Sequence, residues 1–156
     1  ASKIPFDMLY GPAYKGIPLV TSIVIAFASL GRNVPFAFNR KEKKDHGEGG
    51  VIIGTPLKGR VLIVDDVISA GTSVNESVNL ILEEGAKPSG IAISIDREEK
   101  GTGLLSAVEE IKETHHLPIC HLTSLQEIMR YIEHHETYAS HMGAMRDYQK
   151  VYGIKA

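Results

Sequence analysis

Residues 61–73 constrain the fold more than any other stretch of the sequence. They start with four apolar residues, three of them β-branched, continue with Asp65 and Asp66, and end in a run of small residues. An apolar run of this kind is typical of a buried parallel strand, and the small residues are typical of a tight loop. The stretch therefore predicts a strand over 61–64 that opens into a loop at its C-terminal end.

A helix is predicted directly after this loop. Ser73 and Glu76 have the spacing of a capping box, and Gly85 is a plausible stop residue. The apolar face between them consists of Val74, Val78, Ile81 and Leu82. A helix N-terminus gathers unpaired amides and the positive end of the helix dipole. The loop therefore predicts a phosphate site formed by Ser69, Ala70, Gly71, Thr72 and Ser73.

Asp65 and Asp66 would repel a bare phosphate, so we expect them to face another part of the ligand. Sugar hydroxyls or a hydrated Mg²⁺ suit a carboxylate pair, because both favour strong oxygen acceptors. A ribose 5-phosphate group meets both requirements.

A second strand-loop-helix unit precedes the first. Residues 6–10 predict a strand, and residues 11–16 a loop that carries Lys15 between two glycines. The apolar run 17–30 predicts a buried helix ending at Gly31, and it is too short to span a bilayer. Lys15 is either a ligand for a second phosphate or a solvated turn lysine.

Composition narrows the class of protein. The chain has 156 residues, which fits a single domain over 1–156, and 43% of them are hydrophobic, as in a globular protein. A net charge of −2 argues against nucleic-acid binding. The single Cys120 suits a reducing cytoplasm, and no stretch is long enough for a membrane span.

The remaining segments alternate between strand and helix patterns. Strands are predicted over 34–38, 91–95 and 118–122. Helices are predicted from an apolar face formed by Leu104, Leu105, Val108 and Ile111, from a capping box of Ser124 and Glu127, and over 137–152. This alternation predicts an α/β fold, a mainly parallel sheet flanked by helices with ligands at the carboxyl ends of its strands.

Two polar segments remain open to two interpretations each. Residues 39–50 are expected to form a flexible loop, rich in basic residues and ending in glycines. It is either a solvated surface or a lid that neutralises a leaving group. Arg97, after the strand 91–95, either pairs with Glu98 or Glu99 or binds a carboxylate with its fork of donors.

Residues 64–73, Val-Asp-Asp-Val-Ile-Ser-Ala-Gly-Thr-Ser, closely resemble the phosphoribosyl pyrophosphate (PRPP) motif of type I phosphoribosyltransferases. The flanking residues are similar to those of orotate phosphoribosyltransferases. Gly-Pro-Ala-Tyr-Lys-Gly at 11–16 resembles the pyrophosphate loop of that family, and 40–46 resembles its catalytic loop. The resemblance implies a Rossmann-like core, and a strained or cis peptide near Ala13 and Tyr14.

The resemblance also implies an activity: transfer of the 5-phosphoribosyl group of PRPP to orotate, giving orotidine 5′-monophosphate and pyrophosphate in pyrimidine biosynthesis. It assigns catalysis to Asp65, Asp66, Lys44 and His46, and orotate binding to Ser69 and Arg97. The residues implied for PRPP are Tyr14, Lys15, Arg40, Lys41, Lys44, His46, Asp65, Asp66, Val67, Ile68, Ser69, Ala70, Gly71, Thr72 and Ser73. Mg²⁺ is expected through PRPP, with water between the metal and the two aspartates and no direct protein ligand.

In the family the catalytic loop reaches the neighbouring subunit's site, so the resemblance implies a homodimer with shared sites. The first predicted strand begins abruptly, and the chain is expected to lack the family's N-terminal segment, which supplies another lysine and aromatic contacts to orotate. Two alternatives stay open: a purine phosphoribosyltransferase, which shares the PRPP loop, and a non-catalytic PRPP-binding regulator.

Overall fold

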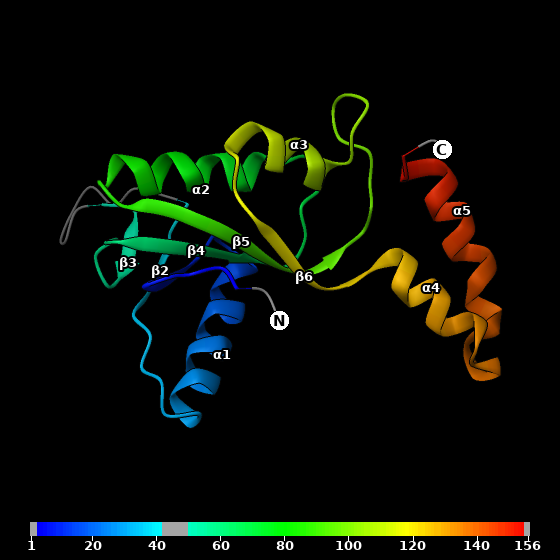
Figure 1. Cartoon of the computed structure of the whole chain (residues 1–156), viewed down its shortest axis with the longest axis horizontal. Helices are drawn as coiled ribbons and strands as arrows, with labels where there is room; N and C mark the ends of the chain where they lie inside the picture. The colour runs from blue at the N-terminus through cyan, green and yellow to red at the C-terminus, as the bar shows by residue number, and fades with distance from the viewer. Residues whose placement is uncertain (1–2, 42–49, 155–156) are drawn as a thin grey trace.

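The computed structural model describes residues 3–41 and 50–154, which form a mixed α/β structure around one sheet (Figure 1). The strands are β1 (Met8–Gly11), β2 (Phe36–Asn39), β3 (Ile52–Gly54), β4 (Arg60–Asp65), β5 (Lys87–Asp96) and β6 (Ile119–Ser124). The helices are α1 (Gly16–Ser29), α2 (Thr72–Glu83), α3 (Ala107–His115), α4 (Leu125–Glu133), the 3-10 helix η1 (Glu136–His141) and α5 (Met142–Tyr152). None of the described helices combines the length and the apolar character that a membrane crossing requires.

The order of the strands places the site. The sheet runs β3-β2-β1-β4-β5-β6, and every neighbouring pair is parallel except β2 and β3. The chain moves from β1 outward to β2 and then returns to the other side of β1 as β4. Between β1 and β4 the order therefore reverses, which is where open α/β sheets bind ligands at the carboxyl ends of their strands. The predicted mainly parallel α/β fold is confirmed.

Helices cover both faces of the sheet because successive apolar side chains of its central strands point to opposite faces. Val61 and Ile63 of β4 pack with buried residues of α2 and α3, whereas Leu62 and Val64 pack with α1 on the opposite face. Figure 1 shows α2 and α3 on one side of the sheet and α1 on the other. Two apolar layers thus fix the central strands in place.

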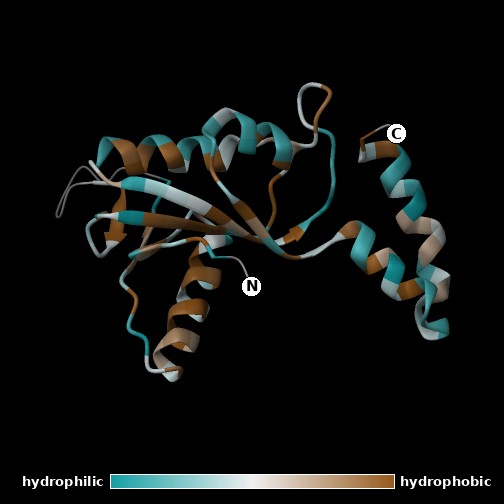
Figure 2. Cartoon of the chain, in the orientation of Figure 1, coloured by the Kyte–Doolittle hydropathy of each residue, from teal (hydrophilic) through white to brown (hydrophobic). Residues whose placement is uncertain are grey.

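Helix α1 corrects one prediction. The helix occupies nearly the predicted residues and ends before Gly31, whose φ of 77° suits the stop. It is not a buried helix, however, since Gly16 and Val20 are its buried residues and Ile25 is 62% exposed. Figure 2 shows that hydrophobic residues extend along most of α1. Because apolar residues lie on all sides of α1, the sequence does not indicate that only one side of the helix contacts the sheet.

The start of α2 corrects a second prediction. Gly71, with φ of 72°, is the N-cap residue, and no side chain caps the helix. Ser73 therefore lies inside the first turn, and its hydroxyl donates to Asp65 Oδ2 at 3.2 Å instead of forming a box with Glu76. The predicted end is confirmed, because α2 stops at Glu83 and Gly85 has φ of 76°.

The third correction concerns α3. Leu104 does not lie on a helical face; it sits in the loop before α3 and is 96% exposed. Ser106 caps α3 and forms a capping box with Glu109, which the apolar pattern did not indicate. The capping box of Ser124 and Glu127 at the start of α4 is confirmed.

Two further elements differ from the predictions. The edge strand β3 was not predicted, since three residues are too short to show an alternating pattern. The expected helix over 137–152 is divided into η1 and α5. With α4 these helices extend away from the sheet, and the C-terminal end of α5 turns back toward the loop after β5 (Figure 1).

Candidate active site

Two loops meet where the strand order reverses. The loop after β1 carries Lys15, and the loop after β4 carries the two aspartates. In the first loop the Ala13–Tyr14 peptide bond is cis, in line with what the family resemblance implies, and the Ala13 amide donates to Asn39 Oδ1 at 2.7 Å. This hydrogen bond ties the loop to the end of β2.

Glycine is required at both ends of that loop. A Cβ atom on Gly11 would lie 2.2 Å from the Gly16 carbonyl oxygen, and one on Gly16 would lie 2.9 Å from the carbonyl oxygen of Val64. The backbone therefore folds back on itself directly against β4. A cavity of about 540 Å³ lies beside it, lined among others by Pro12, Ala13, Arg40, Lys41 and Ser73.

The predicted phosphate loop also encloses a cavity. Residues 67–74 line a space of about 230 Å³ at the start of α2. The first hydrogen bond of the helix runs from the Asn75 amide to the Gly71 carbonyl at 2.9 Å, so the amides of residues 72–74 have no acceptor within the helix. Together with the helix dipole, these free donors are of the kind that favours an anion.

Gly71 satisfies two constraints in this loop. Its φ of 72° is unfavourable for residues with a side chain, and an added Cβ atom would lie 2.7 Å from Ile111 Cδ1 of α3. The sequence indicated only that small residues let an anion approach. The contact with α3 joins two segments far apart in the chain, which no local pattern reveals.

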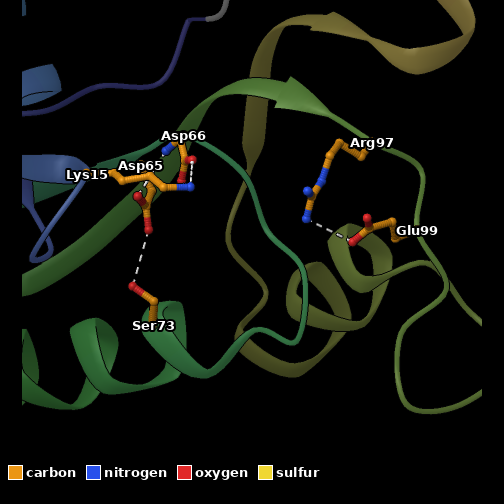
Figure 3. A network of polar contacts seen from close by, with 6 residues as sticks. All are labelled: Lys15, Asp65, Asp66, Ser73, Arg97 and Glu99. Carbon is orange, nitrogen blue, oxygen red and sulfur yellow. Dashed lines mark hydrogen bonds and ion pairs between the residues drawn. The ribbon is translucent and has the colours of Figure 1, made fainter. Parts of the chain in front are cut away.

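Asp65 and Asp66 are neighbours that bind partners from different elements. Asp65, the last residue of β4, is buried and accepts a hydrogen bond from Ser73 of α2. Asp66 accepts one from Lys15, just before α1, with Nζ and Oδ2 2.6 Å apart; Figure 3 draws both contacts. The aspartate pair therefore links the loop after β1 to the start of α2.

The two carboxyl groups consequently differ in acidity. Burial raises the pKa of Asp65 above its usual value, and the hydrogen bonds from the Asp66 amide and Ser73 only partly oppose this. Burial also acts to raise the pKa of Asp66, but the hydrogen bonds from Lys15 and from the Val67 amide outweigh it and lower the pKa. Asp66 is thus the carboxylate held in its ionised form beside a cation.

Only part of the basic segment lies within the described residues. Lys44 and His46 lie outside them, so their predicted roles stay predictions. The Arg40 amide donates to the Val51 carbonyl at 2.9 Å, and Lys41 Nζ lies 5.1 Å from the centre of the Tyr14 ring. Within residues 3–41 and 50–154, the buried Arg40 Nε has no hydrogen-bond partner.

Arg97 forms an ion pair with Glu99, one of the two roles that the sequence left open for it. Its Nη2 lies 3.0 Å from Glu99 Oε2, the pair joined by a dashed line in Figure 3. Its Nε is buried without a hydrogen-bond partner among the described residues. Ser69 is on the neighbouring loop after β4. One donor of the Arg97 guanidinium is therefore engaged, while the buried Nε has no partner among the described residues.

Sequence reasoning missed Asn39, Gly71's contact with Ile111, and the environment of Glu99. Asn39 ends β2 and holds the loop after β1 across 26 residues of sequence. Glu99 was considered only as a surface partner for Arg97, yet Tyr148 of α5 also donates to its carboxylate. Each depends on residues distant in the chain, so no local signal was available.

The comparisons with known proteins agree with this geometry. Residues 3–113 match the family described as "Phosphoribosyl transferase domain". The chain is 56% identical over 153 residues to an orotate phosphoribosyltransferase of Chromobacterium violaceum, covering 98% of the chain and 72% of the relative. It is 54% identical to one of Neisseria meningitidis, covering 99% and 72%.

A solved structure leads to the same family. The crystal structure of an orotate phosphoribosyltransferase from Francisella tularensis superposes with a TM-score of 0.79 at 35% identity. The superposition covers 97% of this chain and 72% of that one. The chain therefore belongs to the orotate phosphoribosyltransferase family, enzymes that transfer the 5-phosphoribosyl group of PRPP to orotate.

Proposed function

We propose that the loops after β1 and β4 form the site at which this chain, as a single domain over 1–156, transfers a phosphoribosyl group from PRPP to orotate. The observation that carries the proposal is the meeting of the two loops where the strand order reverses, with a carboxylate pair between them. In the reaction, the bond from C1 of the ribose to the pyrophosphate oxygen breaks, and a bond from C1 to a ring nitrogen of orotate forms. Orotate supplies the nucleophile, so no covalent intermediate on a side chain is needed.

The loop after β4 is proposed to bind the ribose phosphate. The cavity lined by residues 67–74, at the start of α2, supports this role because helix amides point to it. Asp65 and Asp66 then accept hydrogen bonds from the ribose hydroxyls. Positive charge develops on the ribose as the bond to pyrophosphate breaks, and carboxylates nearby stabilise it.

The basic residues are proposed to bind the leaving pyrophosphate. Lys15 is 74% exposed although it pairs with Asp66, so its ammonium remains accessible to a ligand. Tyr14, Arg40 and Lys41 lie around the same loop, and the partnerless Arg40 Nε supports an anionic ligand there. Lys44 and His46 complete the set in this proposal and stabilise or protonate the leaving group.

Mg²⁺ is proposed to arrive with PRPP. The carboxylates of Asp65 and Asp66, next to the proposed ribose site, are oxygen donors of the kind that suits a hydrated Mg²⁺. Asp65 and Asp66 would hold it through water, and the ion would neutralise charge on the pyrophosphate.

Arg97 and Ser69 are proposed to bind orotate. Arg97 follows β5, the neighbour of β4, so it lies at the same edge of the sheet as the two aspartates. Its buried Nε without a partner among the described residues supports a ligand that accepts hydrogen bonds, as the carboxylate of orotate does.

We also propose a homodimer in which residues 39–50 of one subunit reach the site of the other. The exposed apolar side chains of α1, such as Ile25, support the presence of a partner. A cytoplasmic location fits the free Cys120, which belongs in a reducing compartment.

The assay that tests the function measures pyrophosphate release from PRPP with orotate, and compares adenine, guanine and hypoxanthine as acceptors. We expect release with orotate and about a thousandfold less with the purine bases, because a purine has no carboxylate for the Arg97 guanidinium and would leave that donor unpaired. Faster release with a purine base would identify a purine enzyme. Binding of PRPP with no release for any base would identify a regulator.

A further inference from the structure

The carboxylate of Glu99 joins two distant parts of the chain. One oxygen, Oε2, accepts from Arg97 Nη2 at 3.0 Å, and the other, Oε1, accepts from the hydroxyl of Tyr148. The Glu99 side chain is only 15% exposed. A nearly buried carboxylate with a partner on each oxygen has little freedom to reorient.

Backbone contacts fasten α5 at the same place. The Lys100 amide donates to the Tyr152 carbonyl at 2.8 Å, and Glu99 forms an antiparallel bridge with Gly153. On the other side, the Ala107 amide of α3 donates to the Glu99 carbonyl at 3.0 Å. Residue 99 is therefore held from α3 and from α5, while its side chain holds Arg97.

Arg97 needs such a support if it is to bind the carboxylate of orotate selectively. An arginine side chain has many rotamers, and fixing them in advance lowers the entropic cost of binding. Among the described residues, the partners of its guanidinium include Glu99, whereas its buried Nε has none. The Glu99 carboxylate, together with the burial of Nε, thus sets the direction of the guanidinium, whose side chain is 35% exposed.

We propose that Glu99 and Tyr148 are positioning residues, which orient the Arg97 guanidinium for the planar carboxylate of the base and make base binding depend on the docking of α5. This inference rests on the proposed function, in which Arg97 contacts orotate. It adds that the C-terminal helix α5 controls the affinity for orotate. The contacts of α5 that carry this inference are with Glu99 and Lys100, outside both loops of the proposed PRPP site.

The test uses Tyr148→Phe and Glu99→Gln in the full chain, with Tyr152→Phe as the matched control. Tyr152 lies on the same helix and packs on Tyr148, with ring centres 4.8 Å apart, but its hydroxyl has no hydrogen bond within the described residues. We expect both test variants to raise the KM for orotate about tenfold and to change the KM for PRPP by less than about twofold, since one hydrogen bond to a charged network is lost. Tyr152→Phe should match the wild type.

A second readout observes Arg97 directly, without any substrate. The Nε–H signal of Arg97 in a ¹H–¹⁵N NMR spectrum, assigned with Arg97→Lys, should exchange slowly with water in the wild type because Nε is buried. Tyr148→Phe and Glu99→Gln should accelerate that exchange about tenfold, and Tyr152→Phe should not. Melting temperatures of all variants control for unfolding, and Glu99→Gln serves if Tyr148→Phe does not fold.

The outcomes separate the inference from the function on which it rests. Unchanged exchange at Arg97, or faster exchange with an unchanged KM for orotate, would overturn the role of Glu99 and Tyr148. Faster exchange in a protein whose wild type shows no turnover with orotate would support the positioning of Arg97 and overturn the proposed function instead.

Discussion

At the scale of single residues, the proposed function gives the carboxylates and the lysines separable tasks. We expect Asp66→Ala to raise the KM for PRPP roughly tenfold to a hundredfold, because a charged acceptor for ribose hydroxyls is lost. Lys44→Ala should instead lower kcat about a hundredfold with little change in KM, because the negative charge on the leaving pyrophosphate increases as its bond to the ribose breaks. Steady-state kinetics in both substrates measures this. An equal loss of PRPP affinity in both variants would contradict the division of tasks.

Gly71 is a second residue whose role can be isolated. Gly71→Ala should lower the free energy of unfolding by about 2–4 kcal/mol, because the backbone strain at positive φ adds to the contact with Ile111. Gly85→Ala is the matched control: its φ of 76° is similar, but an added Cβ atom meets nothing within 4 Å. It should cost only about 1–2 kcal/mol. Urea unfolding measures both values.

The double variant Gly71→Ala, Ile111→Val tests the contact itself. Removing Ile111 Cδ1 makes room for the new methyl group, so the double variant should regain part of the stability lost in Gly71→Ala. Strictly additive losses would show that the contact with α3 plays no part.

At the scale of elements, Asp7 and Arg60 join the starts of β1 and β4. The side chains form two hydrogen bonds, of 2.7 and 3.0 Å, and the Arg60 side chain holds the pKa of Asp7 at about 2, well below the model-peptide value of 3.8. Because the unfolded chain takes up this proton at a higher pH than the folded chain, the pair stabilises the fold above pH 3.8 and ceases to do so as the pH falls through about 2.

The effect of Asp7→Asn on stability should therefore depend on pH. The difference in the free energy of unfolding between the wild type and Asp7→Asn should be constant above pH 3.8 and should shrink as the pH falls toward about 2. Asp147→Asn, which removes an exposed pair with Lys150, is the control and should leave stability nearly unchanged. Denaturant unfolding at a series of pH values measures the differences. A constant difference down to the lowest pH would refute the linkage.

At the scale of the whole molecule, shared sites would allow two impaired variants to complement each other. In a mixed dimer of Asp66→Ala and Lys44→Ala, one site combines an intact Asp66 with an intact Lys44 from the partner. Random reassociation makes half of the dimers mixed, each with one intact site, so about a quarter of wild-type activity should return when PRPP is kept below the wild-type KM. Each variant alone, at the same PRPP concentration, should keep its reduced activity after the same unfolding and refolding. No recovery in verified mixed dimers would show that each subunit uses its own loop.

The elements and the site loops were predictable because their signals are local. The apolar run 61–64 with two aspartates and small residues predicted β4, its loop and the start of a helix, and the order of periodic segments predicted the α/β class. The errors occurred where a local pattern is overridden or missing. Ser73 has the spacing of a capping residue but donates its hydroxyl to Asp65, and β3 is too short to show a period.

The sequence by itself therefore determined the parallel strands, the glycine-rich loops and the residue types that suit a phosphorylated sugar, since these depend on neighbours within a few positions. Only the tertiary structure decided which loops meet. It placed β4 beside β1, paired Lys15 with Asp66 across 51 residues, and linked Glu99 to Tyr148 across 49. Such contacts depend on how apolar faces pack in three dimensions, and no periodicity along the chain encodes that packing.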